Sequence, residues 1–276
     1  MPRPVKDDSS QAQRREFLKA TGAVAVGWQL AGEPARGANR RAPEALAING
    51  GPPAVTYSSD KHREAIRWPR FAEEEEKAVL GVLRSPSYSP IDALEKDWGE
   101  QFGAPYAKAH CNGTSALTSM FFALNLPPGS EIMVPSYTFF ATIMPMRLFG
   151  LVPVFVDINP RTLNFDLDDA KRRLTKNTKA VLPVHWYGLP CDMDHICDFA
   201  DERGLIVLED SAQAYGAKLK DKFVGNWGQM AIFSFQLSKT ICAIEGGMGS
   251  YQEREYYERA TTFGHYSIPS RFAERL

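Results

Sequence analysis

The chain has 276 residues, of which 44% are hydrophobic and 24% are charged. These values are ordinary for a globular protein, and the length is ample for the core of one or two domains. With 32 basic and 33 acidic residues, the chain lacks the basic excess typical of nucleic-acid-binding proteins and the acidic excess typical of disorder. The four cysteines form no CxxC pair, which argues against a zinc site or a redox pair, and four cysteines in a chain of this length do not imply a disulfide framework.

The N-terminal segment differs from the rest of the chain. A pair of arginines, Arg14 and Arg15, is followed by the sequence FLK and by a short, weakly apolar run at 20–31. That run is too short to form a stable membrane span. The order resembles a twin-arginine export signal, so we predict that residues 1–45 are a signal and linker and that the protein is exported to the periplasm. The alternative is a disordered basic tail or an amphipathic first helix on a cytoplasmic protein.

From residue 46 onward, helical and strand patterns alternate along the chain. The helical patterns have an apolar stripe, and the strand patterns are short apolar runs. In chain order, the sequence predicts helices at 71–85 and 91–103, a strand at 106–111, a helix at 114–126 capped by Thr114, a strand at 131–135, a helix at 138–150, a strand at 152–158, a helix at 166–175, a strand at 179–185, a helix at 192–204, strands at 205–210, 230–235 and 247–252, and a helix at 253–264.

This alternation predicts an α/β fold. Strands that are almost continuously apolar and are separated by helices indicate a mostly parallel sheet, covered by helices on both faces. In such sheets ligands bind at the carboxyl ends of the strands, so the residues that follow each strand are the first candidates for a functional site. The sequence contains no internal repeat and no glycine-rich nucleotide-binding loop of the GxGxxG or GxxxxGKS type.

The first candidate is the sequence NGTSAL at 112–117, between a predicted strand and a predicted helix. Gly113 permits a tight turn of the backbone. The amides of Thr114 and Ser115 would point out of the N-terminus of the helix, which makes an anion site suited to a phosphate group. An ordinary capped helix is the alternative interpretation.

The second candidate is Asp210, at the end of the apolar strand sequence LIVLED. A carboxylate on the floor of a crevice needs a cationic partner or must take up a proton. A protonated ring nitrogen of a cofactor is one such partner. The alternative is an aspartate that caps the next loop.

The third candidate is Lys239, in the sequence FSFQLSKTICAIEGG at 233–247, whose apolar residues suggest burial. A lysine is rarely buried without a partner, and an amine that is removed from water can form a Schiff base with a carbonyl group. A lysine that extends from a strand end into solvent is the alternative. A phosphate cradle, an aspartate and a lysine, each following a strand, are the contacts that pyridoxal 5′-phosphate needs.

Six motifs carry a resemblance to a known family. In chain order they are NGTSAL, VPSYTFFAT, PVFVDI, VLPVHWYG, EDSAQAYGA and FSFQLSKTICAIEGG. Together they resemble the DegT/StrS/DnrJ family of sugar aminotransferases, which are fold-type I pyridoxal phosphate enzymes. The lysine and EDxAQA motifs are specific in combination, whereas each strand motif alone is weak.

The resemblance implies a role for each matching residue. Lys239 would hold the cofactor, and Asp210 would pair with its ring nitrogen. Gln213 would lie near the 3-hydroxyl group, and Phe139 would stack on the ring. The residue before Glu245-Gly246-Gly247 is Ile244, where glycine is frequent in the family, so the loop has a different local shape here. The phosphate would be held by Gly113, Thr114, Ser115 and Ser234.

The resemblance also implies the reaction and the partners. Glutamate would donate an amino group to a keto-sugar, usually nucleotide-linked, and the freed amine of Lys239 would move the proton. A homodimer is expected. Members continue with a C-terminal small domain, so residues 46–276 would be the large domain without it. A nucleotide-sugar substrate is cytoplasmic, in conflict with the predicted export.

Two other hypotheses remain. One is a member of the same fold that binds the cofactor or a sugar without turnover, as a sensor or scaffold. The other is a dehydratase or another Schiff-base enzyme of this fold. One dehydratase branch of the family has histidine in place of the lysine, and Lys239 argues against that branch.

Overall fold

The computed structural model describes residues 45–54, 56 and 58–263, so the predicted export signal lies outside the described residues. The chain divides into two compact units, Met1–Glu64 and Ala65–Leu276. In the first unit, the described residues form a short 3-10 helix, η2 (Ala47–Asn49), and most of helix α2 (Ser59–Ala65).

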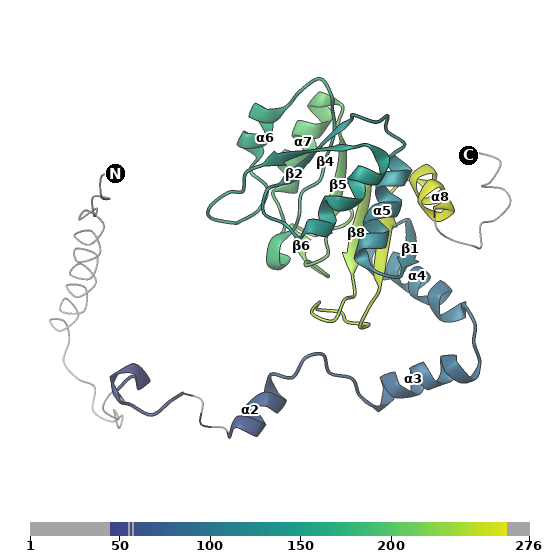
Figure 1. Ribbon diagram of the computed structural model, residues 1–276. Coiled ribbons are helices and arrows are strands. Elements are labelled where there is room, and N and C mark those ends of the chain that lie inside the picture. The colour runs from purple at the N-terminus through teal and green to yellow at the C-terminus, as the bar shows by residue number, and fades with distance from the viewer. Residues whose placement is uncertain (1–44, 55, 57, 264–276) are drawn as a thin grey trace, which may run out of the picture. The chain divides into compact units, whose positions relative to one another are not determined.

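The second unit is built around a seven-stranded sheet with the order β1-β9-β8-β5-β4-β2-β3 (Figure 1). The five strands from β8 to β3 in this order pair in parallel, whereas β9 runs antiparallel to both β8 and β1. The predicted fold, a mostly parallel mixed sheet, is therefore confirmed. The strands are β1 (Tyr106–His110), β2 (Glu131–Pro135), β3 (Val152–Val156), β4 (Thr178–Val181), β5 (Ile206–Asp210), β8 (Met230–Ser234) and β9 (Gly247–Tyr251); β6 (Lys218–Leu219) and β7 (Lys222–Phe223) form a separate hairpin.

Helices cover the sheet, and no helix of the described residues is both long and apolar enough to cross a membrane. Helix α4 ends at Gly103 and α7 at Gly204, as predicted, because each of these glycines has the left-handed conformation that closes a helix. The helices of the second unit are α3 (Glu73–Arg84), α4 (Ser89–Phe102), α5 (Gly113–Leu124), α6 (Leu167–Arg173), α7 (Met193–Arg203) and α8 (Arg254–Thr262).

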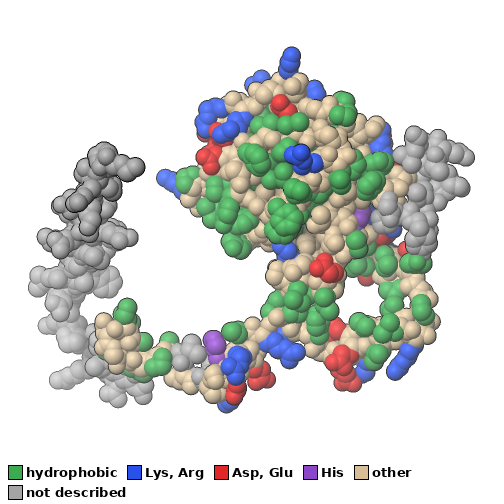
Figure 2. Space-filling view, in the orientation of Figure 1, with side chains coloured by type: hydrophobic (Ala, Val, Ile, Leu, Met, Phe, Trp, Pro, Cys, Tyr) green, Lys and Arg blue, Asp and Glu red, His purple; other side chains and the backbone are tan. Residues whose placement is uncertain are grey.

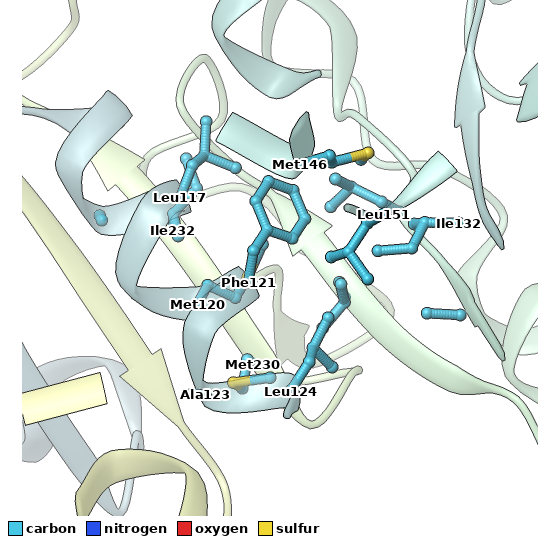
Figure 3. Packing of buried hydrophobic residues seen from close by; sticks show 14 of the residues in the cluster. Leu117, Met120, Phe121, Ala123, Leu124, Ile132, Met146, Leu151, Met230 and Ile232 are labelled. Carbon is cyan, nitrogen blue, oxygen red and sulfur yellow. The ribbon is translucent and has the colours of Figure 1, made fainter. Parts of the chain in front are cut away.

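Both faces of the sheet are buried. Alternate residues of a strand point to opposite faces, and neighbouring residues of β2 accordingly belong to different clusters. Ile132 packs in a cluster with α5 and α8, whereas Met133 packs in a cluster with α6 and α7. Figure 3 shows Met120 and Phe121 of α5 packed with Ile132 and Met230 of the sheet. Burial on both faces explains why the central strands β2, β5 and β8 are mostly apolar rather than alternating.

The helix predicted at 138–150 is wrong as a continuous helix. The segment instead forms two 3-10 helices, η3 (Phe140–Thr142) and η4 (Met144–Phe149). Pro145 lies in the first turn of η4, where it cannot donate the backbone hydrogen bond that a continuous helix would need. The break at residue 143 places Thr142 at the end of a short turn, beside Asp210 at the carboxyl end of β5.

The predicted N-cap of α5 is also wrong. The helix begins at Gly113, and its cap is Asn112 rather than Thr114. The side chain of Asn112 accepts hydrogen bonds from the backbone N–H and the hydroxyl of Ser115, at 2.8 and 2.9 Å. Asparagine and threonine both cap helices, and the two candidates stand only two residues apart.

A buried hydroxyl group in β9 offers a test of the core. Tyr251 is fully buried, and among the described residues its hydroxyl has no hydrogen-bond partner. Burial raises the pKa of Tyr251. Because an unpaired buried hydroxyl is destabilising, we expect Tyr251→Phe to leave the free energy of unfolding unchanged or to raise it by about 1 kcal/mol in urea titrations. A loss of about 1 kcal/mol or more would show that the hydroxyl has a partner, such as a buried water.

Candidate active site

The turn between β1 and α5 has the features of an anion cradle. It lies at the N-terminus of a helix, where backbone N–H groups and the helix dipole favour a negative group. Ser115 already donates its backbone N–H and its hydroxyl to the cap residue Asn112. Thr114 is exposed at the start of the helix, so its amide is better placed than that of Ser115 to meet a ligand.

Ser234 lies directly against this turn. A Cβ atom at Gly113 would stand 3.0 Å from the Cβ of Ser234 and 3.4 Å from its Oγ, a tight contact that would require Ser234 to shift, so glycine favours this approach. Gly247 pairs with Ser234 in the sheet, and a Cβ there would stand 2.5 Å from the carbonyl carbon of Asn112. The glycine motif after Lys239 therefore lets β9 pack against the turn. The structure brings the predicted phosphate residues Gly113, Thr114 and Ser234 together.

Asp210 is buried at the carboxyl end of β5, with 3% of its surface exposed. Its Oδ2 accepts a hydrogen bond of 2.7 Å from the hydroxyl of Thr142, and its Oδ1 accepts one of 3.1 Å from the backbone N–H of Ala212. Burial raises the pKa of Asp210, and these hydrogen bonds and the charge of Lys239 oppose that rise. Within the described residues, no cationic group donates a hydrogen bond to this carboxylate, which leaves it suited to a cationic ligand.

Glu209, the neighbour of Asp210, anchors the surrounding loops. Its side chain is fully buried and accepts backbone hydrogen bonds from Gly225, Trp227 and Gly228 at 2.7, 2.7 and 2.8 Å. A fourth bond of 3.0 Å joins it to Nε2 of His185. The glutamate thus binds the loop before β8 and the segment after β4 to the strand that carries Asp210.

His185 completes this buried arrangement. Burial lowers the pKa of His185, but its hydrogen bonds with Cys191 and Glu209 outweigh burial and raise the pKa to about 10. The backbone N–H of Cys191 donates to Nδ1 at 3.0 Å, which places the proton of the neutral ring on Nε2, where it is donated to Glu209. The backbone N–H of His185 donates to the carbonyl oxygen of Asp210 at 3.2 Å. His185 therefore fixes the end of β5 through both its side chain and its backbone.

Lys239 lies in the loop between β8 and β9 and is half-buried. Its charge lowers the pKa of Asp210, so the amine and the carboxylate act on one another electrostatically. Its backbone is held at both ends, since its N–H donates to the carbonyl oxygen of Gln236 at 2.8 Å and its carbonyl oxygen accepts from Nε1 of Trp68 at 3.2 Å. The structure brings Lys239 to the same edge of the sheet as Asp210 and Ser234.

The burial that the apolar residues around Lys239 suggest is only partial. Phe233 and Phe235 are buried, but Leu237 and Ile244 are 46% and 58% exposed. The regular strand ends at Ser234, and the loop beyond it has no alternating face to bury. Lys239 is therefore only partly removed from water.

Ile244 adopts a backbone conformation that suits glycine. Its φ is 69°, in the left-handed region that a β-branched residue rarely enters, which gives a physical reason for the frequent glycine in the resembled family. We expect Ile244→Gly to raise the free energy of unfolding by up to about 1 kcal/mol, because it removes this strain. Thermal denaturation would measure the change. Ile244→Val is the control and should leave stability unchanged; equal effects of the two substitutions would contradict the account.

Two other predicted residues lie at this edge with different surroundings. Gln213 is half-buried, and its Oε1 accepts a hydrogen bond of 3.0 Å from the backbone N–H of Tyr187. Phe139 is 60% exposed, with its ring 4.4 Å from that of Phe140. Figure 2 shows that hydrophobic side chains are exposed over much of the visible surface of the second unit. The ring of Phe139 is thus open to a flat ligand.

The residues fit pyridoxal 5′-phosphate. This group needs an anion cradle, a carboxylate for its ring nitrogen and an amine for its aldehyde. Asp210 pairs with Ile232, and Ser234 lies two residues further along that neighbouring strand. From strand geometry, the Cα atoms of Asp210 and Ser234 are then roughly 8 Å apart, a separation that suits a pyridine ring with its phosphate arm. Within 45–54, 56 and 58–263, no group of three or more His, Cys, Asp or Glu side chains could hold a metal ion.

The chain has a mostly parallel sheet, and a helix N-terminus, a buried aspartate and a lysine lie at one edge of it. This arrangement is that of the fold-type I pyridoxal phosphate enzymes. The solved structures that the chain resembles share this fold. The chain belongs to the DegT/DnrJ/EryC1/StrS aminotransferase family, whose model matches residues 69–275. The family predicted from the six motifs is therefore confirmed.

Three similar proteins illustrate the relationship. The chain is 39% identical over 173 residues to GDP-perosamine synthase of Escherichia coli O157:H7, a match that covers 63% of this chain and 48% of that protein. It is 34% identical to the solved aminotransferase of Psychrobacter cryohalolentis, with a TM-score of 0.69 and coverage of 71% and 51%. It is 32% identical to the solved E. coli GDP-4-keto-6-deoxy-D-mannose-3-dehydratase with bound hydrated PLP, with a TM-score of 0.65 and coverage of 69% and 51%. The chain spans about half the length of the curated relatives it matches.

Four functional residues were missed in the sequence. Thr142 lies in the middle of the helix predicted at 138–150, and Glu209 is the first acid of the strand sequence LIVLED. His185 is the last residue of the strand predicted at 179–185. Trp68 precedes the first predicted helix of this unit and carries no motif. The burial of Glu209 and His185 could have been suspected, because both stand within apolar strand sequences.

Proposed function

We propose that this protein is a pyridoxal-phosphate-dependent aminotransferase that transfers an amino group from an amino acid, glutamate in the first instance, to a keto-sugar. The observation that carries the proposal is Asp210, a buried carboxylate with no cationic hydrogen-bond partner among the described residues, at the same sheet edge as Lys239 and the helix turn. Such a carboxylate is suited to the protonated ring nitrogen of this cofactor.

Four residues of the site, Asp210, Thr114, Ser234 and Lys239, each have a task in this proposal. The cofactor, when bound, supplies a ring that withdraws electrons from the substrate carbon. Asp210 holds a proton on the ring nitrogen by its negative charge. Thr114 and Ser234 bind and orient the phosphate group. The amine of Lys239 holds the aldehyde carbon and, once released, moves a proton at the substrate carbon.

The substrate class rests on the relatives. The first two curated relatives are named GDP-perosamine synthase, which supports a nucleotide-linked keto-sugar as the acceptor. A dehydratase is also among the similar structures. Lys239 favours amino transfer over the dehydratase branch, in which the resembled family has histidine at this position. None of the relatives reported above supports a non-catalytic sensor.

Assembly and location remain part of the proposal. We propose a homodimer, because large apolar side chains such as Phe139, Phe140 and Leu148 are more than half exposed, and exposed apolar groups favour association. We also propose that residues 1–45 act as a twin-arginine signal that carries the folded protein to the periplasm, with the remaining residues as the cofactor-binding domain. Export would require an acceptor other than a cytoplasmic nucleotide-sugar.

The half-reaction tests the proposed function. The chain is incubated with pyridoxal phosphate and freed of excess cofactor, and L-glutamate is added. We expect the visible absorbance band to be replaced by the band of the amine form of the cofactor, and 2-oxoglutarate to restore it. Cofactor binding without this conversion, with glutamate and every other amino donor tried, would contradict an aminotransferase and support the sensor alternative.

A further inference from the structure

The carboxylate of Asp210 is held by a residue that no motif identifies. Thr142 is buried, with 1% of its surface exposed, and its hydroxyl donates to Oδ2 of Asp210 at 2.7 Å. In the sheet, β4 lies between β5, which carries Asp210, and β2, which precedes Thr142. The short turn η3 therefore extends across the end of β4 to place this hydroxyl.

The hydrogen bond has a defined direction. The hydroxyl of Thr142 also lies 2.8 Å from the hydroxyl of Thr138, which is half-buried. A hydroxyl has one proton, and that of Thr142 is given to Asp210, so Thr138 must donate to Thr142. The chain of bonds runs from Thr138 through Thr142 to a carboxylate that only accepts. A protonated Oδ2 would have to donate to Thr142 and would reverse this order.

We propose that Thr142 is a positioning residue of the cofactor site, whose hydroxyl keeps the Asp210 carboxylate ionised and oriented toward a cationic ring nitrogen. The inference rests on the proposed function, since it assumes that such a ring binds beside Asp210. The second oxygen, Oδ1, is held by the backbone N–H of Ala212 at 3.1 Å, so both oxygens have fixed donors.

The electrostatic surroundings of Asp210 agree with this role. Burial raises the pKa of Asp210, and the hydrogen bond from Thr142 is the largest influence that lowers it, followed by the backbone N–H of Ala212. Among the ionisable groups of the described residues, Lys239 and His185 also lower this pKa by their charges. Thr142 therefore offsets part of the effect of burial on this pKa without adding a charge.

The first experiment follows the carboxyl group itself. The chain is labelled with 13C at the aspartate carboxyl carbons, and the signal of Asp210 is assigned by its loss in Asp210→Asn. In the cofactor-free protein, we expect Thr142→Val to move the titration midpoint of Asp210 upward by about one pH unit. Thr142→Ser, which retains the hydroxyl, should restore the wild-type midpoint. Thr138→Val should move the midpoint upward by less, and it tests the same chain of bonds at a half-buried position if Thr142→Val does not fold.

A matched control separates this role from a general effect of removing a hydroxyl. Thr178 is also buried, at the start of β4, and its hydroxyl donates to the carboxylate of Glu131 at 3.2 Å. Thr178→Val should leave the Asp210 midpoint unchanged. An unchanged midpoint in both Thr142→Val and Thr138→Val, or an equal shift in Thr178→Val, would overturn the proposal.

The second experiment measures the dissociation constant of pyridoxal phosphate as a function of pH. The affinity should fall on the acid side as Asp210 takes up its proton. In Thr142→Val this fall should begin at higher pH, and binding near the wild-type midpoint should be about tenfold weaker, with Thr142→Ser close to wild type. A wild-type chain that binds no pyridoxal phosphate would overturn the proposed function, whereas the carboxyl titration would still decide the role of Thr142. Wild-type binding with an unchanged acid limb in Thr142→Val would overturn only the inference on Thr142.

Discussion

Lys239→Ala is expected to lose the visible absorbance band that the wild-type chain forms with pyridoxal phosphate. The rate of the half-reaction with glutamate should fall by at least about 10³-fold, because the substitution removes the group that moves the proton. The fold should be retained, since the side chain is only half-buried and lies in the loop between β8 and β9. Stopped-flow absorbance would measure the rate, and circular dichroism would confirm the fold.

A surface lysine provides the control for this substitution. Lys179 is exposed on β4, and its amine donates only a long hydrogen bond of 3.4 Å to the carbonyl oxygen of Lys176. Lys179→Ala should therefore leave the band and the rate unchanged. If Lys239→Ala retained both the band and the half-reaction, the assignment of the active-site lysine would be wrong.

Glu209→Ala is expected to be among the most destabilising single substitutions in the protein. It would leave the side chain of His185 and three backbone N–H groups unpaired in a dry environment. Loss of one partner of a buried polar network typically costs about 3–5 kcal/mol. We expect a decrease of that size in the free energy of unfolding, measured by urea denaturation.

The control for Glu209 is an exposed glutamate with one partner. Glu73 pairs with Lys77 on the surface of α3 at 3.0 Å, and both side chains are more than two-thirds exposed. Glu73→Ala should change the free energy of unfolding by less than about 0.5 kcal/mol, because an exposed ion pair contributes little. Equal losses in the two variants would show that the hydrogen bonds of Glu209 do not stabilise the fold as proposed.

The sheet and the outline of the site could be predicted because both depend on local patterns. Continuous apolar runs mark strands that are covered on both faces, and the residues after such strands meet at one edge. That logic predicts that Asp210, Ser234 and Lys239 lie at one edge of the sheet. The approach of Ser234 to Gly113 agrees with it, since β8 ends and β9 begins beside the turn.

The details that local patterns could not supply depend on contacts between distant segments. The periodicity at 138–150 is helical, and only the packing around Pro145 shows that the segment breaks and presents Thr142 to Asp210. The four partners of Glu209 come from segments that are up to 24 residues away. The apolar residues around Lys239 suggest burial in the sequence. Burial, however, requires a regular element whose one face packs against the core, and β8 ends at Ser234, before Lys239.

The central claim is that the helix turn, Asp210 and Lys239 form one site for pyridoxal phosphate. The most direct test is to incubate the chain with the cofactor, reduce it with borohydride, digest it and locate the phosphopyridoxyl group by mass spectrometry. The account predicts one labelled position, Lys239, and loss of that label when Asp210 is replaced by alanine. A label spread over surface lysines, or no label in the wild-type chain, would contradict it.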